Sequence, residues 1–155
     1  MHPTLIVMPT YNERDNLPRM AQQLLQLPTK VDLLVVDDNS PDGTGKLADE
    51  LAAQHPEIHV LHRTGKNGLG RAYLAGFTWA LERDYEFIFE MDGDFSHNPN
   101  DVPQLLEAAQ ADLRLVKRGN GVHNMMYSVD LLDSVTQRCR KAMALISGKG
   151  AGRKP

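Results

Sequence analysis

The feature that most constrains the fold of this chain is a regular alternation of short apolar runs with longer amphipathic stretches over its first two thirds. Each apolar run has the length of a buried strand, and the stretches between them carry apolar side chains at helical spacing. Strands that alternate with helices predict an α/β fold, in which a mostly parallel sheet is covered by helices on both faces. The expected strands are residues 5–8, 32–37, 58–62 and 86–91.

Four helical stripes accompany these strands, at residues 17–27, 47–52, 72–81 and 103–111. Asp15 or Asn16 is suited to cap the first helix, with Pro18 in its first turn, and Thr44 is suited to cap the second. We expect the aromatic side chains of the third helix to belong to the core. Its stripe consists of Ala72, Tyr73, Gly76, Phe77, Ala80 and Leu81.

The alternation fades after about residue 113. Residues 113–116 are a candidate fifth strand, which Arg114 interrupts, and residues 133–146 carry a weak helical stripe. Residues 148–155 are rich in glycine and basic side chains, and we expect them to be disordered.

The composition fits a single globular domain. The chain of 155 residues is long enough for one core, and 41% hydrophobic with 24% charged residues excludes a disordered or fibrous protein. Cys139 is the only cysteine, which excludes an intramolecular disulfide framework and fits a reducing compartment. Because it has no nearby acid-base partner in the sequence, we assign it no catalytic role. No apolar run approaches the roughly 18 residues of a membrane span, and polar residues follow the first run too soon for a signal peptide.

The charges divide unevenly along the chain. Residues 1–113 contain 8 Lys and Arg against 18 Asp and Glu, whereas residues 114–155 contain 9 against 2. A basic tail on an acidic body predicts either an anionic partner or a disordered segment.

Polar clusters follow three of the expected strands, at residues 9–13, 37–44 and 92–94. Ligands of an open parallel sheet bind beyond the carboxyl ends of its strands, and acids gathered there repel one another unless a cation or a donor-rich ligand compensates. The alternative is that these acids only form turns and helix caps. Pro41-Asp42-Gly43 is a turn signal of that kind.

Asp92-Gly93-Asp94 is the most informative of these clusters. Two carboxylates on one turn are suited to a hard divalent cation, since Mg²⁺ is commonly held by one or two carboxylates together with phosphate oxygens. An EF-hand is excluded because His97 replaces the required glycine and Pro103 the terminal glutamate. We expect His97 to be a loop histidine with its hydrogen bonds satisfied.

The glycine-rich segment at residues 66–70 matches neither a Walker A loop nor a dinucleotide-binding fingerprint. It is either a flexible connection or a part of a nucleotide site. In the second case Lys66 or Arg71 would face a phosphate.

Four segments in this order resemble the family 2 glycosyltransferases of the GT-A fold, and among them the polyprenol (dolichol) monophosphate mannose synthases. They are Pro-Thr-Tyr-Asn-Glu at 9–13, Asp-Asp-Asn-Ser-Pro-Asp-Gly-Thr at 37–44, Gly-Leu-Gly at 68–70 and Met-Asp-Gly-Asp-Phe-Ser-His at 91–97. The resemblance covers residues 4–112 and implies an incomplete Rossmann-like GT-A fold. It divides the chain into a nucleotide-sugar-binding domain, residues 1–118, and a divergent basic tail, residues 119–155.

The resemblance also implies the roles of individual residues. Asp92 and Asp94 would be catalytic through the metal that they hold, Mg²⁺ or Mn²⁺, although some relatives have a glutamine ligand where this chain has Ser96. The guanosine, the ribose and the diphosphate of the donor would contact the remaining positions. The implied donor-binding residues are Pro9, Tyr11, Glu13, Val36, Asp38, Asp92, Gly93, Asp94 and Arg118.

The activity that the resemblance implies is inverting transfer of mannose from GDP-mannose to a polyprenyl or dolichyl phosphate. The implied location is cytoplasmic and peripheral on the cytoplasmic membrane face, where a basic tail gains about 1 kcal/mol per well-placed Lys or Arg. No nucleic acid is implied. Two alternatives stay open: a nucleotide-sugar-binding fragment without catalysis, and a phosphotransferase-type hydrolase with Asp92 as nucleophile and Asp94 as acid.

Overall fold

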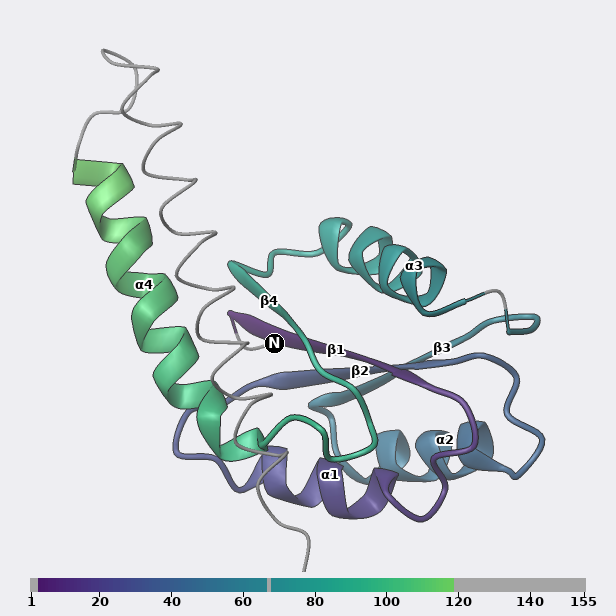
Figure 1. Ribbon diagram of the computed structural model, residues 1–155. Helices are drawn as coiled ribbons and strands as arrows, with labels where there is room; N and C mark the ends of the chain where they lie inside the picture. Colours follow the sequence, from purple (N-terminus) through teal and green to yellow (C-terminus); the bar gives the residue numbers. More distant parts are fainter. Residues whose placement is uncertain (1–2, 67, 119–155) are drawn as a thin grey trace, which may run out of the picture. The chain divides into compact units, whose positions relative to one another are not determined.

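The structure is a computed structural model that describes residues 3–66 and 68–118 (Figure 1). Three features expected from the sequence lie outside the described residues: the helical stripe at 133–146, the disordered end at 148–155 and the environment of Cys139. The chain divides into two compact units, the first spanning Met1–Asn100 and the second beginning at Asp101. The domain boundary expected after residue 118 stays a prediction.

The first unit is built on a sheet of four parallel strands in the order β3-β2-β1-β4 (Figure 1). All four predicted strands are confirmed. β1 lies at the centre and pairs with both β2 and β4, so that the carboxyl ends of the strands share one edge. The strands are β1 (Thr4–Thr10), β2 (Asp32–Asp37), β3 (Ile58–His62) and β4 (Phe87–Glu90).

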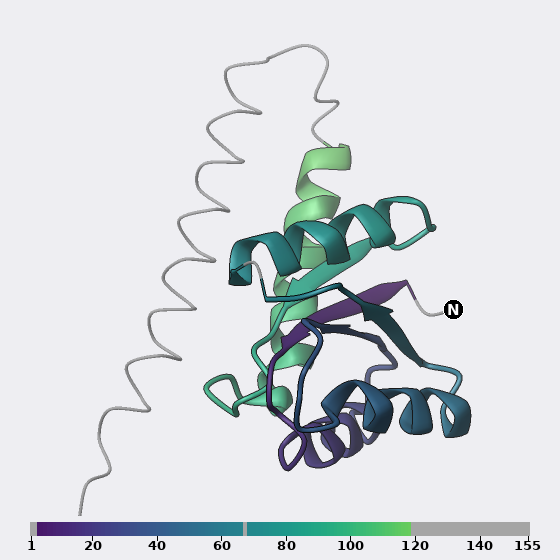
Figure 2. The same cartoon turned by 90° about the vertical axis from the view of Figure 1, so that its right-hand side faces the viewer.

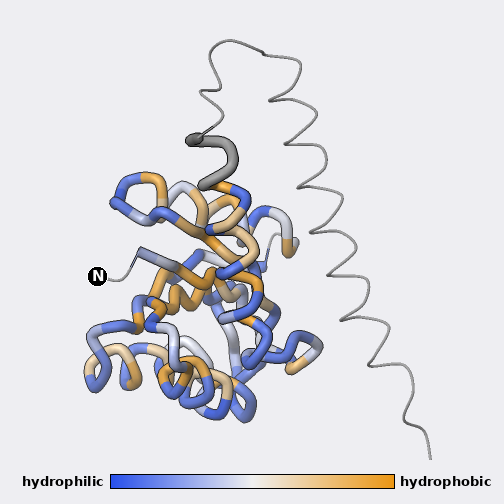
Figure 3. The backbone as a smooth tube through the Cα atoms, turned by 90° about the vertical axis from the view of Figure 1, so that its left-hand side faces the viewer, coloured by the Kyte–Doolittle hydropathy of each residue, from blue (hydrophilic) through white to orange (hydrophobic). Residues whose placement is uncertain are grey.

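Helices cover both faces of this sheet, as predicted (Figure 2). Helices α1 (Leu17–Leu25) and α2 (Thr44–Gln54) lie on one face, and α3 (Leu69–Leu81) lies on the other. β1 and β2 are buried along their whole length because both of their faces are covered. Figure 3 shows the apolar residues gathered along these central strands.

Helix α3 sits close to the sheet at Gly76. A Cβ added to Gly76 would lie 2.3 Å from Cγ1 of Val7, so only glycine allows this approach. The buried residues of α3 are Ala72, Gly76 and Ala80. Leu81, expected on the same stripe, is 80% exposed, because the helix turns it away from the sheet one residue after Ala80.

The predicted cap at Thr44 is wrong. The N-cap of α2 is Gly43, whose φ of 89° lies in the left-handed region, and Thr44 is the first residue of the helix. Asn16 does occupy the N-cap position of α1, although its side chain makes no capping hydrogen bond.

The candidate fifth strand at 113–116 is also wrong. After a 3-10 turn, η1 (Pro99–Asp101), helix α4 (Val102–Arg118) continues through these residues. The reason is local: leucine, arginine and lysine are good helix formers, and the sequence has no glycine or proline between Gln104 and Arg118 to end the helix. Among the described residues, no helix has the length and hydropathy that a membrane span needs.

Candidate active site

A cavity of about 300 Å³ opens at the carboxyl edge of the sheet, within the first unit. All three polar clusters noted in the sequence contribute to its wall, so the structure brings together residues that are up to 85 positions apart, from Pro9 to Asp94. The cavity is lined by Pro9, Thr10, Tyr11, Glu13, Asp38, Lys66, Leu69, Ala72, Asp92, Gly93 and Asp94.

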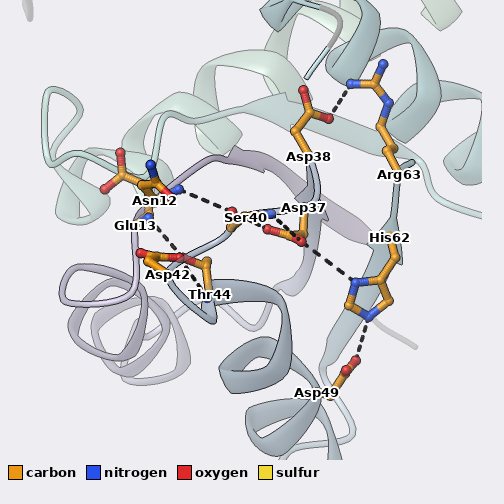
Figure 4. A network of polar contacts seen from close by, with 10 residues as sticks. All are labelled: Asn12, Glu13, Asp37, Asp38, Ser40, Asp42, Thr44, Asp49, His62 and Arg63. Carbon is orange, nitrogen blue, oxygen red and sulfur yellow. Dashed lines mark hydrogen bonds and ion pairs between the residues drawn. The ribbon is translucent and has the colours of Figure 1, made fainter. Parts of the chain in front are cut away.

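The loop after β1 is held in place by side chains of the loop after β2 (Figure 4). Three successive backbone amides, at residues 12–14, each donate a hydrogen bond to an oxygen of that second loop. The acceptors are Ser40 Oγ at 3.2 Å, Thr44 Oγ1 at 3.0 Å and Asp42 Oδ2 at 3.2 Å. The motifs at 9–13 and 37–44 therefore form one structural unit.

Asp37 supports this unit through Ser40 (Figure 4). Its buried carboxylate accepts hydrogen bonds from the Ser40 hydroxyl, at 2.5 Å, and from the Ser40 amide, at 3.2 Å. Nδ1 of His62 lies 3.9 Å from the same carboxylate, and Nε2 of His62 lies 2.9 Å from Asp49. A Cβ on Gly45 would come within 2.6 Å of Asp37 Oδ2, so glycine is required there. Asp37 does not line the cavity, and we assign it a structural role.

Asp42 and Thr44 are turn and helix-end residues, which is the alternative role considered for the acids of these clusters. Asp42 Oδ1 accepts hydrogen bonds from the Thr44 amide, at 2.9 Å, and from the Thr44 hydroxyl, at 2.6 Å. Both residues act on the cavity only through the loop that they hold.

Asp38 faces the cavity and forms an ion pair with Arg63 (Figure 4). The side chains of Asp38 and Arg63 are only 7% and 14% exposed, so each compensates the burial of the other. The sequence reading missed Arg63. The available signal was its position, since it directly follows β3 at the same edge of the sheet as the acids.

Asp92 is held by two contacts from other parts of the chain. Its Oδ1 accepts a hydrogen bond of 2.7 Å from the hydroxyl of Tyr73 on α3, and its backbone amide donates to Nδ1 of His97 at 3.3 Å. One ring nitrogen of His97 thus has a hydrogen-bond partner, which agrees with the predicted loop histidine. Burial, followed by the hydrogen bond to Asp92, raises the pKa of Tyr73 far above its ordinary value, so its hydroxyl stays protonated and donates.

The aromatic side chains of α3 belong to the core, as predicted: Tyr73, Phe77 and Trp79 are partly buried and pack against it. Tyr73 also reaches the cavity wall, where its hydroxyl donates to Asp92. A tyrosine on an apolar stripe next to small residues was the signal that could have indicated this contact.

Asp94 is exposed and lies two residues further along the same turn, after the buried Gly93. Hydrogen bonds from the hydroxyl of Ser96 and then from its amide, the latter at 2.9 Å, lower the pKa of Asp94. Asp94 is therefore a carboxylate at neutral pH.

The carboxylates of Asp92 and Asp94 are suited to bind a divalent cation only together with oxygen atoms of a bound ligand. Among the described residues, no group of three or more His, Cys, Asp or Glu side chains is arranged to hold a metal by itself. Asp92 and Asp94 nevertheless line one cavity, and two carboxylates completed by phosphate oxygens and water are an ordinary environment for Mg²⁺ or Mn²⁺. The site thus fits an ion that is bound together with a phosphorylated ligand.

Lys66 supplies positive charge at this cavity. Its Nζ lies 4.1 Å from the centre of the Tyr11 ring, and it is the one cationic side chain among the lining residues that the structure describes. Of the two roles considered for the glycine-rich segment, this placement favours a part in ligand binding. Arg71, the other cation considered, is exposed on α3 and is not among the lining residues.

Thr10 adds a further polar group to the wall. The residue is 3% exposed, and its hydroxyl has no hydrogen-bond partner among the described residues. An unpaired buried hydroxyl costs about 1–3 kcal/mol, which a bound ligand or water would relieve.

Two residues expected at the site are not among the residues that line the cavity. Val36 is fully buried in the core between β2 and α3, and its side chain does not line the cavity. Arg118 is the last residue of α4, beyond the part of the helix whose side chains the structure describes. Their roles in donor binding stay predictions.

The parallel sheet, with a cavity and paired carboxylates at its carboxyl edge, has the arrangement in which open α/β folds bind their ligands. A sequence model of Glycosyl transferase family 2 matches residues 5–134, and the chain is a member of that family. The resemblance noted in the sequence is therefore confirmed.

Two curated relatives are similar over most of this chain. Polyprenol monophosphomannose synthase of Mycolicibacterium smegmatis is 54% identical over 118 residues, which are 74% of this chain and 44% of the relative. Undecaprenyl-phosphate mannosyltransferase of Micrococcus luteus is 54% identical over 115 residues, which are 74% of this chain and 47% of the relative. This chain therefore spans less than half the length of either relative.

The fold agrees with a solved structure. The crystal structure of S. aureus TarS superposes with a TM-score of 0.57 at 17% identity, over 72% of this chain and 20% of that chain. At this identity the likeness shows the fold alone. Together with the observed sheet, it confirms the α/β fold of the GT-A type.

Proposed function

We propose that this chain is the donor-binding part of a mannosyltransferase that transfers mannose from GDP-mannose to a polyprenyl phosphate, with inversion. The observation that carries the proposal is the single cavity in which Tyr11 and Glu13, Asp38, and the pair Asp92 and Asp94 meet. The two relatives that are 54% identical support mannose as the sugar and a polyprenyl phosphate as the acceptor.

The donor is proposed to lie along the cavity from β2 to β4. Pro9, Tyr11 and Glu13 contact the guanosine, and Asp38, fixed by Arg63, accepts from the ribose hydroxyls. The diphosphate lies against Gly93, which lines the cavity between the two carboxylates in sequence and has no side chain to oppose the ligand. Lys66 lines the same cavity, where its positive charge would offset phosphate charge.

Asp92 and Asp94 would hold Mg²⁺ or Mn²⁺ together with the diphosphate. When bound, that ion neutralises negative charge on the departing nucleoside diphosphate. An oxygen of the acceptor phosphate forms a bond to the anomeric carbon as the bond to the diphosphate oxygen breaks, which inverts the configuration. A phosphate monoester has a second pKa near 6 and is already an anion at neutral pH, so the chain needs no strong general base.

The acceptor places the reaction at a membrane surface. We propose that the protein acts peripherally at the cytoplasmic face, where its basic segment, residues 114–155, attracts anionic lipids. Co-sedimentation with vesicles containing anionic lipid, but not with neutral vesicles, is the expected result.

The direct test is transfer of label from radioactive GDP-mannose to polyprenyl phosphate in the presence of Mn²⁺ or Mg²⁺. Wild-type protein should form a lipid-linked product, and Asp94→Asn should form it about 100-fold more slowly or worse. Asp84→Asn, which removes an exposed carboxylate outside the cavity, is the matched control and should keep the wild-type rate. Absence of both transfer and GDP binding in the wild type would exclude the proposal.

A second candidate is donor binding without transfer. The observation that favours it is that this chain spans less than half the length of its two curated relatives. Calorimetry with GDP and Mn²⁺ separates the two: binding without any lipid-linked product supports this candidate, and turnover excludes it.

A further inference from the structure

We propose that Tyr73 is a positioning residue that holds the carboxylate of Asp92 in the orientation required to bind the divalent cation. The inference rests on the proposed function, because it assumes that a cation binds at Asp92 and Asp94. Neither residue pattern nor family resemblance assigned Tyr73 to the site.

The position of the Tyr73 hydroxyl is fixed by the way α3 packs. One turn of α3 further along, Gly76 lets the helix approach β1 so closely that even a methyl group would meet Val7. Ala72, next to Tyr73, is 1% exposed, and the Tyr73 ring stacks on Phe77 with 6.2 Å between centroids. A half-buried ring that stacks on Phe77 and packs against the core has little freedom, so its hydroxyl is a fixed donor.

Asp92 receives this donor on one carboxylate oxygen only. The bond of 2.7 Å engages Oδ1, while the backbone amide of Asp92 is held separately by His97. We assign the cation to Oδ2, since a carboxylate with one oxygen bonded and its backbone fixed presents the other in a single direction.

The charge of the group that holds each carboxylate determines how strongly that carboxylate attracts a cation. Asp38 in the same cavity is paired with Arg63, whose positive charge offsets the charge of the carboxylate. Asp92 is held by a neutral phenol, which restricts the carboxylate without cancelling its charge. Of the two acids, Asp92 therefore keeps the full negative charge that attracts a cation.

Removing an outer hydrogen bond to a metal-binding side chain typically costs 10–100-fold in metal affinity. Tyr73→Phe removes only the hydroxyl and keeps the ring that packs on Phe77. We therefore expect Mn²⁺ to bind at least about 10-fold more weakly to Tyr73→Phe than to the wild type when GDP is present.

Tyr85→Phe is the matched control. The Tyr85 hydroxyl donates to the carboxylate of Asp32 at 2.9 Å, so this variant also removes a tyrosine–aspartate hydrogen bond. Asp32 is the first residue of β2 and lies at the opposite end of the sheet from Asp92. Loss of the hydrogen bond between Tyr85 and Asp32 should leave the Mn²⁺ affinity within about twofold of the wild type, because this pair shares no partner with the pair of Tyr73 and Asp92.

The measurement is the free Mn²⁺ signal in electron paramagnetic resonance, titrated against the 155-residue chain with saturating GDP. Calorimetric GDP affinity in EDTA is the second readout. Weaker Mn²⁺ binding with unchanged metal-free GDP affinity supports the positioning role. An equal loss of both affinities indicates a structural role and overturns it, as does Mn²⁺ affinity equal to that of the wild type.

The experiment distinguishes a failure of the proposed function from a failure of the role of Tyr73. If wild-type protein binds no Mn²⁺ in the presence of GDP, the proposed function itself fails, and the role of Tyr73 falls with it. If the wild type binds Mn²⁺ and Tyr73→Phe binds it as tightly, only the role of Tyr73 is overturned.

Discussion

The acidic residues at the carboxyl edge of the sheet differ in the kind of partner that each one has. Asp38 is paired with a cation, Arg63, whereas Asp92 and Asp94 are held by hydroxyl and amide donors that carry no charge. Neutral donors fix a carboxylate without removing its charge. The edge therefore keeps negative charge next to a cavity, which is the arrangement that a cation requires.

Arg63→Met should destabilise the protein by about 3 kcal/mol, because it leaves the carboxylate of Asp38 buried and unpaired. Urea unfolding monitored by circular dichroism measures the change. The double variant Asp38→Asn/Arg63→Met should be more stable than Arg63→Met alone, since it removes the uncompensated charge. Equal stability of the two variants would contradict the importance of this ion pair.

The pKa of Asp42 gives a prediction about acid stability. Burial acts to raise this pKa, but hydrogen bonds from Thr44 and from the Arg14 amide outweigh it, and the pKa lies below its ordinary value of 3.8. The folded state thus binds the proton less readily than the unfolded state. The stabilisation is fully present above the unfolded pKa and is lost as the pH falls through the folded value.

Wild-type protein should accordingly lose stability as the pH falls below about 4, and Asp42→Asn should lose less over the same range. Urea midpoints measured between neutral pH and pH 2.5 test this. Asp15→Asn, which removes a carboxylate from an exposed site on the first loop, is the control for loss of charge alone. A decline in Asp42→Asn as steep as that of the wild type would show that Asp42 does not contribute.

At the scale of elements, α3 carries the parts of the site that periodicity did not identify. Its start lines the cavity through Leu69 and Ala72, and its first turns carry Tyr73. The close packing of α3 on the sheet at Gly76 therefore determines where these side chains lie in the cavity wall.

Gly76→Ala should displace α3, because the new Cβ would lie 2.3 Å from Val7 Cγ1 and backbone and side chain must shift. Overpacking of this kind costs about 1–3 kcal/mol, and the shift of Tyr73 should weaken Mn²⁺ binding with GDP as well. Urea unfolding and the Mn²⁺ titration measure the two effects.

Gly70→Ala on the same helix is the control, because a Cβ there meets nothing within 4 Å. It should leave stability unchanged or raise it by up to about 1 kcal/mol. If Gly76→Ala behaved like Gly70→Ala, the tight approach of α3 to β1 would not be a constraint on the fold.

Strand and helix order could be predicted from the sequence because it depends on local patterns. All four strands were found, since each is a compact apolar run between polar ends. The candidate strand at 113–116 failed because its apolar residues also fit a helix, and nothing local ends α4 before it. Short apolar runs do not distinguish the two conformations.

The candidate site was predictable only in part, for a related reason. The acids could be assigned to one edge because parallel strands share that edge. Their partners Tyr73 and Arg63 could not be found, since periodicity shows which face a side chain occupies but not which residue it meets across the sheet. The supporting role of Asp37 rests on such contacts with Ser40 and His62 and was likewise invisible.

At the scale of the whole molecule, every residue that lines the cavity belongs to the compact unit Met1–Asn100. The family match over residues 5–134 therefore includes the whole described cavity. The excess of acids in residues 1–113 has a local explanation as well, because five of them lie at this edge. These are Glu13, Asp37, Asp38, Asp92 and Asp94.

The anchoring of the loop after β1 has a consequence for the strength of ligand binding. Ordering one residue of a flexible loop costs about 1–2 kcal/mol of conformational entropy. In this protein the amides of residues 12–14 are already fixed by Ser40, Thr44 and Asp42. A nucleotide that binds against Tyr11 and Glu13 therefore contacts a loop that is already ordered in the folded protein. Its binding free energy does not include the entropy cost of ordering that loop.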